Sequence, residues 1–570
     1  MNKKRNKLTL KLWTLSLLSS ILLSIPFIFP HMGLVALVAF VPLFAAEYLA
    51  KEERVRYFFG IYYSSFLVWN LITTYWIWYA TPGGAIGAFL LNSLQMSIIF
   101  ALFRWMRGIA KGFLPYLFFI FAWLTWEHYY FTWDVSWPWL VLGNAFATSI
   151  KSVQWYEFTG SLGGSFWVLL TNALLFRLLL LFVKRERAIA SFISLILVIT
   201  SPIIFSHILY SNYKEVENPS EFTVLQPNID PYKEKFLGLT QEKQNEILID
   251  LMAESVSRVV EKNCNVADSV GNTILSTIGS SMIGFDTAPQ VTILGPETFI
   301  GWSKHAFIEG RENSNPYFIY FRNWVQNSNS SLILGAVTNK IYNTPLAPTE
   351  TATELASGVW RDKFNTAMFI NNSGEVEYYH KSKLVILAES NPLKNTKFAF
   401  IEKLLGSIAG GIGNFGTQPN REVVTTSSNA KIGVAVCYES VYGEFCREYI
   451  LNGANALGII TNDGWWRDTP GHKQHLSYAS LRAIETRRSI ARSANTGISA
   501  LINQRGDIIS ELGWAERGYI NGTLNLNDKI TPFVLYGDII GRVSSFIFAL
   551  FLLMGISRKI SKKYIVKEAC

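Results

Sequence analysis

The chain alternates between long apolar segments and one long polar segment, and this pattern predicts its architecture. A helix that crosses the hydrocarbon core of a bilayer needs about 20 apolar residues. By this measure the sequence predicts seven N-terminal transmembrane helices and one C-terminal helix, at roughly 12–29, 32–49, 57–80, 84–103, 113–127, 165–182, 189–209 and 534–556. We therefore expect a transmembrane bundle over 1–210, a polar domain over 211–530, and a C-terminal helix with a basic tail over 531–570.

Within the polar domain, short runs rich in β-branched residues alternate with longer amphipathic stretches. Strands are predicted at 222–226, 291–296, 331–337, 366–371, 375–380, 432–437, 456–461 and 498–503, and helices at 240–262, 314–328, 441–452 and 472–490. Strands separated by helices indicate a layered α/β domain. The stretch 264–290, rich in Ser, Gly and Thr, is expected to be an inserted loop, and 393–420 is either a mobile lid or an ordinary surface segment.

Lysine and arginine residues are concentrated in alternate short loops. Such residues favour the cytoplasmic side of a membrane. They cluster before the first predicted transmembrane helix and after the second, fourth, sixth and eighth, whereas the loops at 30–31 and 81–83 have none. This distribution predicts that both termini lie in the cytoplasm and that the polar domain lies outside it. The net charge of +9 then follows from the topology, so we expect no nucleic-acid partner.

The candidate chemistry centres on Cys437, at the end of the apolar run IGVAVC. A lone cysteine is most often a small buried apolar residue. However, Glu297 ends a second apolar run, VTILGPE, and Lys381 lies in a third segment, YYHKSKLV. A carboxylate, an ammonium group and a thiol near strand ends are the groups needed to form a thiolate and to stabilise an oxyanion. No C-x-x-C or clustered His/Cys spacing indicates a metal site.

These segments carry a resemblance to a known family. The motifs GPE, Y-x-K, CYE and ND-x-W, at 295–297, 379–381, 437–439 and 462–465, resemble those of the nitrilase superfamily with its Glu-Lys-Cys triad. Transmembrane segments on both sides of the domain make the chain similar to the apolipoprotein N-acyltransferase family. The segments VLQPNID, HKSKLVILAES, H-x-x-H-L, R-A-x-E, RSANTG and SWPWLVLG fit as well. The chain departs from the family's P-F-G-E element at 386–389, where it has Ile-Leu-Ala-Glu.

The resemblance implies a nitrilase-like α-β-β-α sandwich inserted between transmembrane helices, in a monomeric enzyme of the bacterial cytoplasmic (inner) membrane with its catalytic domain on the periplasmic side. It implies Glu297 as general base, Lys381 as oxyanion stabiliser and Cys437 as nucleophile. The implied donor is a membrane phospholipid. The acyl chain would pass through a cysteine thioester to the N-terminal amine of a diacylglyceryl-modified apolipoprotein, the last step of lipoprotein maturation. This chemistry requires no cofactor and no metal.

The resemblance also suggests supporting residues. Glu389 and Glu439 are expected either to orient the lysine and its loop or to serve as structural ion-pair partners, and Tyr438 to back the nucleophile. Trp465 and Trp466 either line an acyl-chain groove or anchor the domain at the membrane interface. An alternative function is that of a membrane-anchored nitrilase-type amidohydrolase, with water as second nucleophile. A transporter is a weaker alternative, because the predicted helices contain few ionisable residues.

Overall fold

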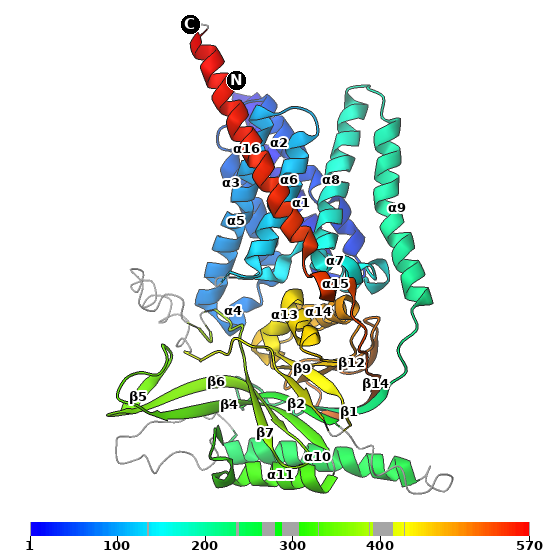
Figure 1. Cartoon of the computed structure of the whole chain (residues 1–570). Helices are drawn as coiled ribbons and strands as arrows, with labels where there is room; N and C mark the ends of the chain where they lie inside the picture. The colour runs from blue at the N-terminus through cyan, green and yellow to red at the C-terminus, as the bar shows by residue number, and fades with distance from the viewer. Residues whose placement is uncertain are drawn as a thin grey trace. The chain divides into compact units, whose positions relative to one another are not determined.

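The computed structural model describes residues 2–133, 136–234, 239–264, 280–287, 307–328, 330–386, 388–390, 414–426 and 428–568. The chain forms two compact units, whose elements are labelled in Figure 1. The helical unit comprises Met1–Tyr75, Ala85–Tyr213 and Leu535–Cys570. The second unit comprises Trp76–Gly84 and Lys214–Val534, so a short piece from the helical part of the sequence belongs with the polar domain.

The helical unit is built from long apolar helices. They are α1 (Asn2–Ile28), α2 (Val41–Glu52), α3 (Phe58–Thr74), α5 (Pro82–Ile109), α6 (Leu114–Tyr130), α8 (Ser161–Val183), α9 (Ile189–Asn212) and α16 (Ile539–Glu568), with the short α7 (Tyr156–Thr159) before α8. Some polar groups inside the unit are paired with other parts of the chain. The Asn172 side chain, for example, accepts from the Phe40 amide at 2.8 Å and donates to the Ala36 carbonyl at 2.8 Å. Such pairing is required where water is absent.

The prediction of seven N-terminal spans is wrong. Six helices of the described chain are long and apolar enough to cross a membrane, five of them before the polar domain and one after it. They are Arg5–Ile28, Gly33–Glu52, Pro82–Ile109, Ser161–Val183, Ile189–Asn212 and Ile539–Ser561. The predicted spans 57–80 and 113–127 correspond to α3 and α6, which have 17 residues each. A helix of that length extends about 25 Å, less than the roughly 30 Å of the hydrocarbon core.

The break after α3 follows from contacts with a distant part of the chain. The helix ends at Thr74, and the four-residue α4 (Ile77–Ala80) belongs to the second unit. Trp76 is fully buried there, with its ring centroid 4.6 Å from that of Trp466 and its indole nitrogen donating to Gln474 at 3.2 Å. Burial of a large aromatic side chain therefore draws this segment away from the helix that the hydropathy predicted.

The second unit contains two β-sheets with helices on their outer faces. The larger sheet has the order β14-β1-β2-β4-β6-β5, with β3 on β4 and β7 on β6, and the smaller has the order β13-β12-β11-β10-β9-β8. The strands of the larger sheet are β1 (Pro219–Gln226), β2 (Ser280–Thr287), β3 (Phe307–Ile308), β4 (Ser331–Asn343), β5 (Thr353–Ala356), β6 (Val359–Ile370), β7 (Val376–His380) and β14 (Gly518–Asn525). Those of the smaller are β8 (Val423–Thr425), β9 (Lys431–Val436), β10 (Ala456–Thr461), β11 (Ile490–Ala494), β12 (Ser499–Ile502) and β13 (Ile508–Leu512).

Four helices cover these sheets. In Figure 1, α10 (Gln241–Cys264) and α11 (Pro316–Ser328) run along the larger sheet. Their apolar faces form one core with β1, β4 and β6, to which Leu248, Phe321 and Leu334 contribute at 1% exposure or less. The helices α13 (Gly443–Leu451) and α14 (Pro470–Thr486) contact the smaller sheet. The layers are thus helix, sheet, sheet and helix.

Most predicted strands and helices of this unit occur within a few residues of their expected bounds. Three differences matter. The stretch 264–290 contains β2, which pairs in parallel with β1 and β4, so the expectation of an inserted loop is wrong over 280–287. Strands β3, β5, β8, β11, β13 and β14 were not predicted, and the helix expected over 472–490 ends at Thr486, before β11 begins at Ile490. The predicted strand 291–296 and most of the segment 393–420 lie outside the described residues.

Candidate active site

Cys437 lies at a sharp turn directly after β9. The strand ends at Val436, and a single 3₁₀ turn begins at Cys437 itself, whose φ is 54°. A positive φ is unfavourable for a residue with a Cβ, by about 1–3 kcal/mol, so surrounding contacts must hold it. Its carbonyl accepts from the Ser440 hydroxyl at 2.8 Å. A strained strand-to-helix turn of this kind presents a nucleophile at the edge of a sheet, and the Cys437 side chain is accordingly only half-buried.

Lys381 follows the last residue of β7 and is held by a carboxylate. Its amide donates to the Asn365 carbonyl at 2.8 Å, which keeps the lysine beside β6. Its ammonium group, 1% exposed, donates to both oxygens of Glu389 at 2.9 and 2.7 Å. The same carboxylate accepts from the Asn365 amide group at 2.8 Å and from the Val385 amide at 2.7 Å. Glu389 therefore fixes the lysine and also the turn that follows it.

Glu439 joins the cysteine turn to the lysine segment. One of its oxygens accepts from the Val436 amide at 2.8 Å. The other accepts from the Ser382 amide at 2.6 Å and from the Tyr379 hydroxyl at 3.0 Å. The residue is fully buried, and hydrogen bonds to a buried carboxylate are stronger than those between neutral groups. The Glu439 side chain thus ties Val436, the residue before Cys437, to Tyr379 and Ser382, which lie on either side of Lys381 in the sequence.

The charges at the site favour a permanent ammonium beside a neutral thiol. Burial raises the pKa of the Cys437 thiol, while the Lys381 charge and a hydrogen bond with Thr461 act in the opposite direction. For Lys381 burial lowers the pKa, but the negative charge of Glu389 and its hydrogen bonds to the ammonium group outweigh burial and hold the pKa above its ordinary value. The thiol therefore requires a base to ionise it. Glu297, for which that role is predicted, lies outside the described residues.

A buried network behind the cysteine was not predicted. His475, on α14, lies 3.2 Å from the Cys437 carbonyl through Nε2 and 2.9 Å from Asp463 through Nδ1. Asp463 also accepts from Arg492 of β11 at 2.6 Å. All three side chains are fully buried, and Arg492 and His475 hold the pKa of Asp463 below its usual range against the effect of burial. The sequence signal was that all three residues stand in motifs already noted for the family resemblance, ND-x-W, H-x-x-H-L and RSANTG.

The aromatic candidates lie around the site in different ways. Tyr438 is buried and makes an edge contact with Tyr442, with ring centroids 5.2 Å apart. Trp465 contacts the Tyr232 ring at 5.6 Å. Trp466 lies between the Trp76 ring and the imidazole of His475, which is 5.4 Å away. Both tryptophans are half-buried, and their role in an acyl-chain groove stays a prediction.

Two family descriptions match the chain. Residues 287–530 match the carbon-nitrogen hydrolase family, which confirms the nitrilase-like domain. Residues 19–174 match the N-terminal domain of apolipoprotein N-acyltransferases. Solved structures of the nitrilase superfamily also align with the chain. One from Saccharomyces cerevisiae has a TM-score of 0.35 and 14% identity, covering 57% of this chain and 97% of that one. A carbon-nitrogen hydrolase from Helicobacter pylori has a TM-score of 0.33 and 13% identity, covering 58% and 94%.

Full-length relatives agree with both matches. The apolipoprotein N-acyltransferase of Chlorobaculum tepidum is 29% identical over 97% of this chain and 98% of its own length. That of Geobacter metallireducens is 24% identical over 92% of each. The alignment therefore spans the apolar helices and the catalytic unit together. The chain belongs to the apolipoprotein N-acyltransferase family of enzymes, within the nitrilase superfamily.

Proposed function

We propose that the chain transfers an acyl chain from a membrane phospholipid to the N-terminal amine of a diacylglyceryl-modified apolipoprotein, through a thioester on Cys437. The observation that carries this proposal is the pairing of a buried, permanently charged Lys381 with a thiol presented at a strained turn. A fixed ammonium stabilises an oxyanion without having to reorganise. A half-buried thiol at such a turn is accessible to a carbonyl carbon.

In the first step, Cys437 attacks an ester carbonyl of the phospholipid. The thiol proton passes to the predicted base, Glu297, and the carbonyl oxygen becomes an oxyanion that faces Lys381. Collapse of the tetrahedral intermediate breaks the carbon–oxygen bond of the ester. The lysophospholipid leaves with the proton returned by Glu297, and the acyl chain remains on sulfur as a thioester.

In the second step, the α-amine of the apolipoprotein attacks the thioester carbonyl. The amine loses a proton to Glu297, the oxyanion again faces Lys381, and the carbon–sulfur bond breaks. The products are an amide on the acceptor and the restored thiol. Both steps use the same oxyanion position, which explains why Lys381 is held from two directions, by Glu389 and by the strand β6.

The experiment that tests this proposal detects the acyl-enzyme. Purified protein incubated with phospholipid alone should gain the mass of one acyl chain, removable by hydroxylamine, and Cys437→Ala should abolish both the mass gain and transfer. The matched control is Cys446→Ala. That thiol is buried in α13 and its pKa is raised to about 12 by burial, so its removal should leave acylation intact. Full transfer by Cys437→Ala would refute the proposal.

The amidohydrolase alternative differs in its second nucleophile. An acyltransferase should hold its thioester in water until an amine acceptor arrives, because water is a poor competitor at a site that excludes it. We therefore expect the acyl-enzyme to persist without acceptor and to discharge when a diacylglyceryl-cysteine peptide is added. Discharge at the same rate with and without the peptide would favour hydrolysis.

We further propose that the catalytic unit lies on the periplasmic side of the cytoplasmic membrane. The support is the distribution of basic residues among the short loops. A protease added to spheroplasts should cleave within the catalytic unit while leaving the basic C-terminal tail intact. Protection of the catalytic unit in spheroplasts, with cleavage only after lysis, would contradict this orientation.

A further inference from the structure

Two cavities in the helical unit differ in how their polar groups are used. The first has a volume of about 530 Å³ and lies between α8 and α9. Its polar side chains already donate within the chain. Trp155 donates to the Ser152 carbonyl, Trp167 to Val198, and Ser201 to Leu197. Its lining can therefore face hydrocarbon without an unsatisfied donor.

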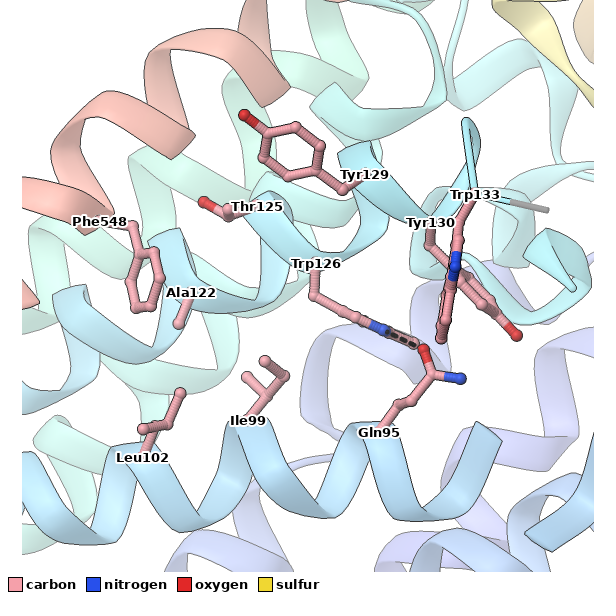
Figure 2. A pocket seen from close by; sticks show the side chains of 10 residues that line it. All are labelled: Gln95, Ile99, Leu102, Ala122, Thr125, Trp126, Tyr129, Tyr130, Trp133 and Phe548. Carbon is pink, nitrogen blue, oxygen red and sulfur yellow. Dashed lines mark hydrogen bonds between the residues drawn. The ribbon is translucent and has the colours of Figure 1, made fainter. Parts of the chain in front are cut away.

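The second cavity, of about 260 Å³, lies among α5, α6 and α16 and is drawn in Figure 2. One part of it is aliphatic and aromatic, with Ile99 and Leu102 on α5 and Phe548 on α16. The other part contains Gln95, the aromatic side chains Trp126, Tyr129 and Tyr130 of the last turn of α6, and Trp133 just beyond the helix. The cavity is thus largely apolar. Gln95 lies toward one end, and the Thr125 hydroxyl on the Phe548 side donates to the Phe121 carbonyl at 2.6 Å.

Gln95 offers hydrogen-bond donors to this cavity. Its oxygen accepts from the indole nitrogen of Trp126 at 3.0 Å. An indole N–H can only donate, so this contact fixes which end of the amide is oxygen. Figure 2 shows the amide nitrogen pointing away from Trp126, to the side where Tyr130 and Trp133 lie. Among the residues that the structure describes, no acceptor is recorded for that nitrogen or for the Trp133 indole.

Such donors are costly where Gln95 lies. It lies within the candidate span Pro82–Ile109 and is half-buried. A polar group without a partner in hydrocarbon is strongly unfavourable, and water is absent there. The physical requirement is a ligand that brings an acceptor to the amide and hydrocarbon to the rest of the cavity.

We propose that this cavity binds one ester-linked acyl chain of a glycerophospholipid, whose ester carbonyl accepts from the Gln95 amide. The carbonyl fits better than the phosphate because it is a neutral acceptor, whereas an anionic phosphate would lose its hydration at a lining whose described residues include no lysine or arginine. The chain runs along Leu102, two helical turns or about 10 Å from Gln95, toward Phe548.

The volume and the aromatic lining agree with this occupant. Small-molecule pockets measure about 300–1,000 Å³, so a cavity of about 260 Å³ suits part of one chain and not a whole lipid. Trp126 and Tyr130 stack with ring centroids 5.2 Å apart, which forms a rigid wall. This binding site lies wholly within the helical unit and uses no residue of the proposed catalytic chemistry.

The test uses full-length protein in nanodiscs with two photoreactive phospholipids, each carrying a diazirine in one chain. One probe has ester-linked chains and the other is its ether-linked analogue, which lacks the carbonyls. Peptides of α5 and α6 that gain probe mass are quantified by mass spectrometry. We expect the wild type to capture the ester probe about three to ten times more than the ether probe, the effect of one hydrogen bond.

Three variants make the test decisive. Gln95→Leu should reduce the ester-to-ether ratio to about one, and Leu102→Trp should block capture of both probes in the cavity. Leu94→Trp, at an exposed position of α5 outside the lining, should behave as the wild type. Equal capture of the two probes by the wild type, or an ester preference that survives in Gln95→Leu, would overturn the proposal. Because capture is measured without acyl transfer, the result is independent of the proposed catalytic function.

Discussion

The substitution Glu389→Gln tests how the catalytic unit keeps a charged lysine buried. The carboxylate lies 2.7 Å from the Lys381 ammonium and accepts two further hydrogen bonds, from Asn365 and Val385. Glutamine has nearly the same shape but no charge, and one of its two terminal atoms is a donor. The variant therefore removes the charge partner and leaves at least one donor facing another donor.

The expected size follows from burial. Removing one partner of a buried ion pair costs about 3–5 kcal/mol, and about 1.4 kcal/mol corresponds to one pKa unit. The pKa of Lys381 should therefore fall by about 2–4 units. In the wild type the folded pKa lies above the ordinary value of 10.5, so the ammonium is complete below pH 10.5 and is lost only as pH rises through the folded pKa. In the variant, burial dominates and the loss begins below pH 10.5.

The assay is the rate of acyl-enzyme formation, measured by rapid quench and mass spectrometry from about pH 6 to about pH 11. We expect the alkaline limb of the Glu389→Gln profile to move about 2–4 pH units toward acid, together with a lower maximum. The matched control is Glu377→Gln on the exposed face of β7, which should leave the profile unchanged. An alkaline limb at the wild-type position in Glu389→Gln would refute the assigned role of the carboxylate.

Further substitutions test the surroundings of the nucleophile. Asp463→Asn leaves the fully buried Arg492 without its charge partner. We therefore expect the free energy of unfolding to fall by about 3–5 kcal/mol, visible as a lower thermal midpoint. An unchanged midpoint would contradict a structural role of this ion pair. Gly433→Ala places a Cβ 2.5 Å from the Tyr449 side chain. This overpacking should lower the free energy of unfolding by about 1–3 kcal/mol, again visible as a lower thermal midpoint. An unchanged midpoint would show that α13, which carries Tyr449, can shift. Ser440→Ala removes the hydroxyl's contacts with the Cys437 carbonyl at 2.8 Å and with His475 Nε2 at 3.0 Å. We expect acylation to slow about fivefold, and an unaltered rate would contradict a positioning role.

Much of the fold could be predicted from the sequence because periodicity reports which face of an element is buried. The short apolar, β-branched runs at 331–337 and 456–461 predicted β4 and β10, and the amphipathic pattern of 240–262 predicted α10. The long apolar runs predicted α8, α9 and α16. The membership in the N-acyltransferase family followed from the order of short motifs, and it was confirmed by relatives that cover the whole chain.

The elements that were missed depend on contacts between distant parts of the chain. Hydropathy predicted a continuous span over 57–80, but burial of Trp76 against Trp466 ends the helix. Likewise nothing local distinguishes 280–287 as a strand, since it acquires that conformation by pairing with β1 and β4. The local pattern shows that a segment prefers apolar surroundings. It does not show which distant strand or side chain will pack against that segment.

The sequence by itself determined the division into apolar helices and an α/β unit, and it identified the reactive residue types at the ends of their segments. Only the tertiary structure decided that Glu439 ties the Cys437 turn to the lysine segment, that Glu389 holds Lys381, and that His475 lies behind the cysteine carbonyl. The physical reason is that a carboxylate or imidazole in sequence is most often a solvated side chain. Its role is set by burial and by partners tens of residues away, which no local pattern records.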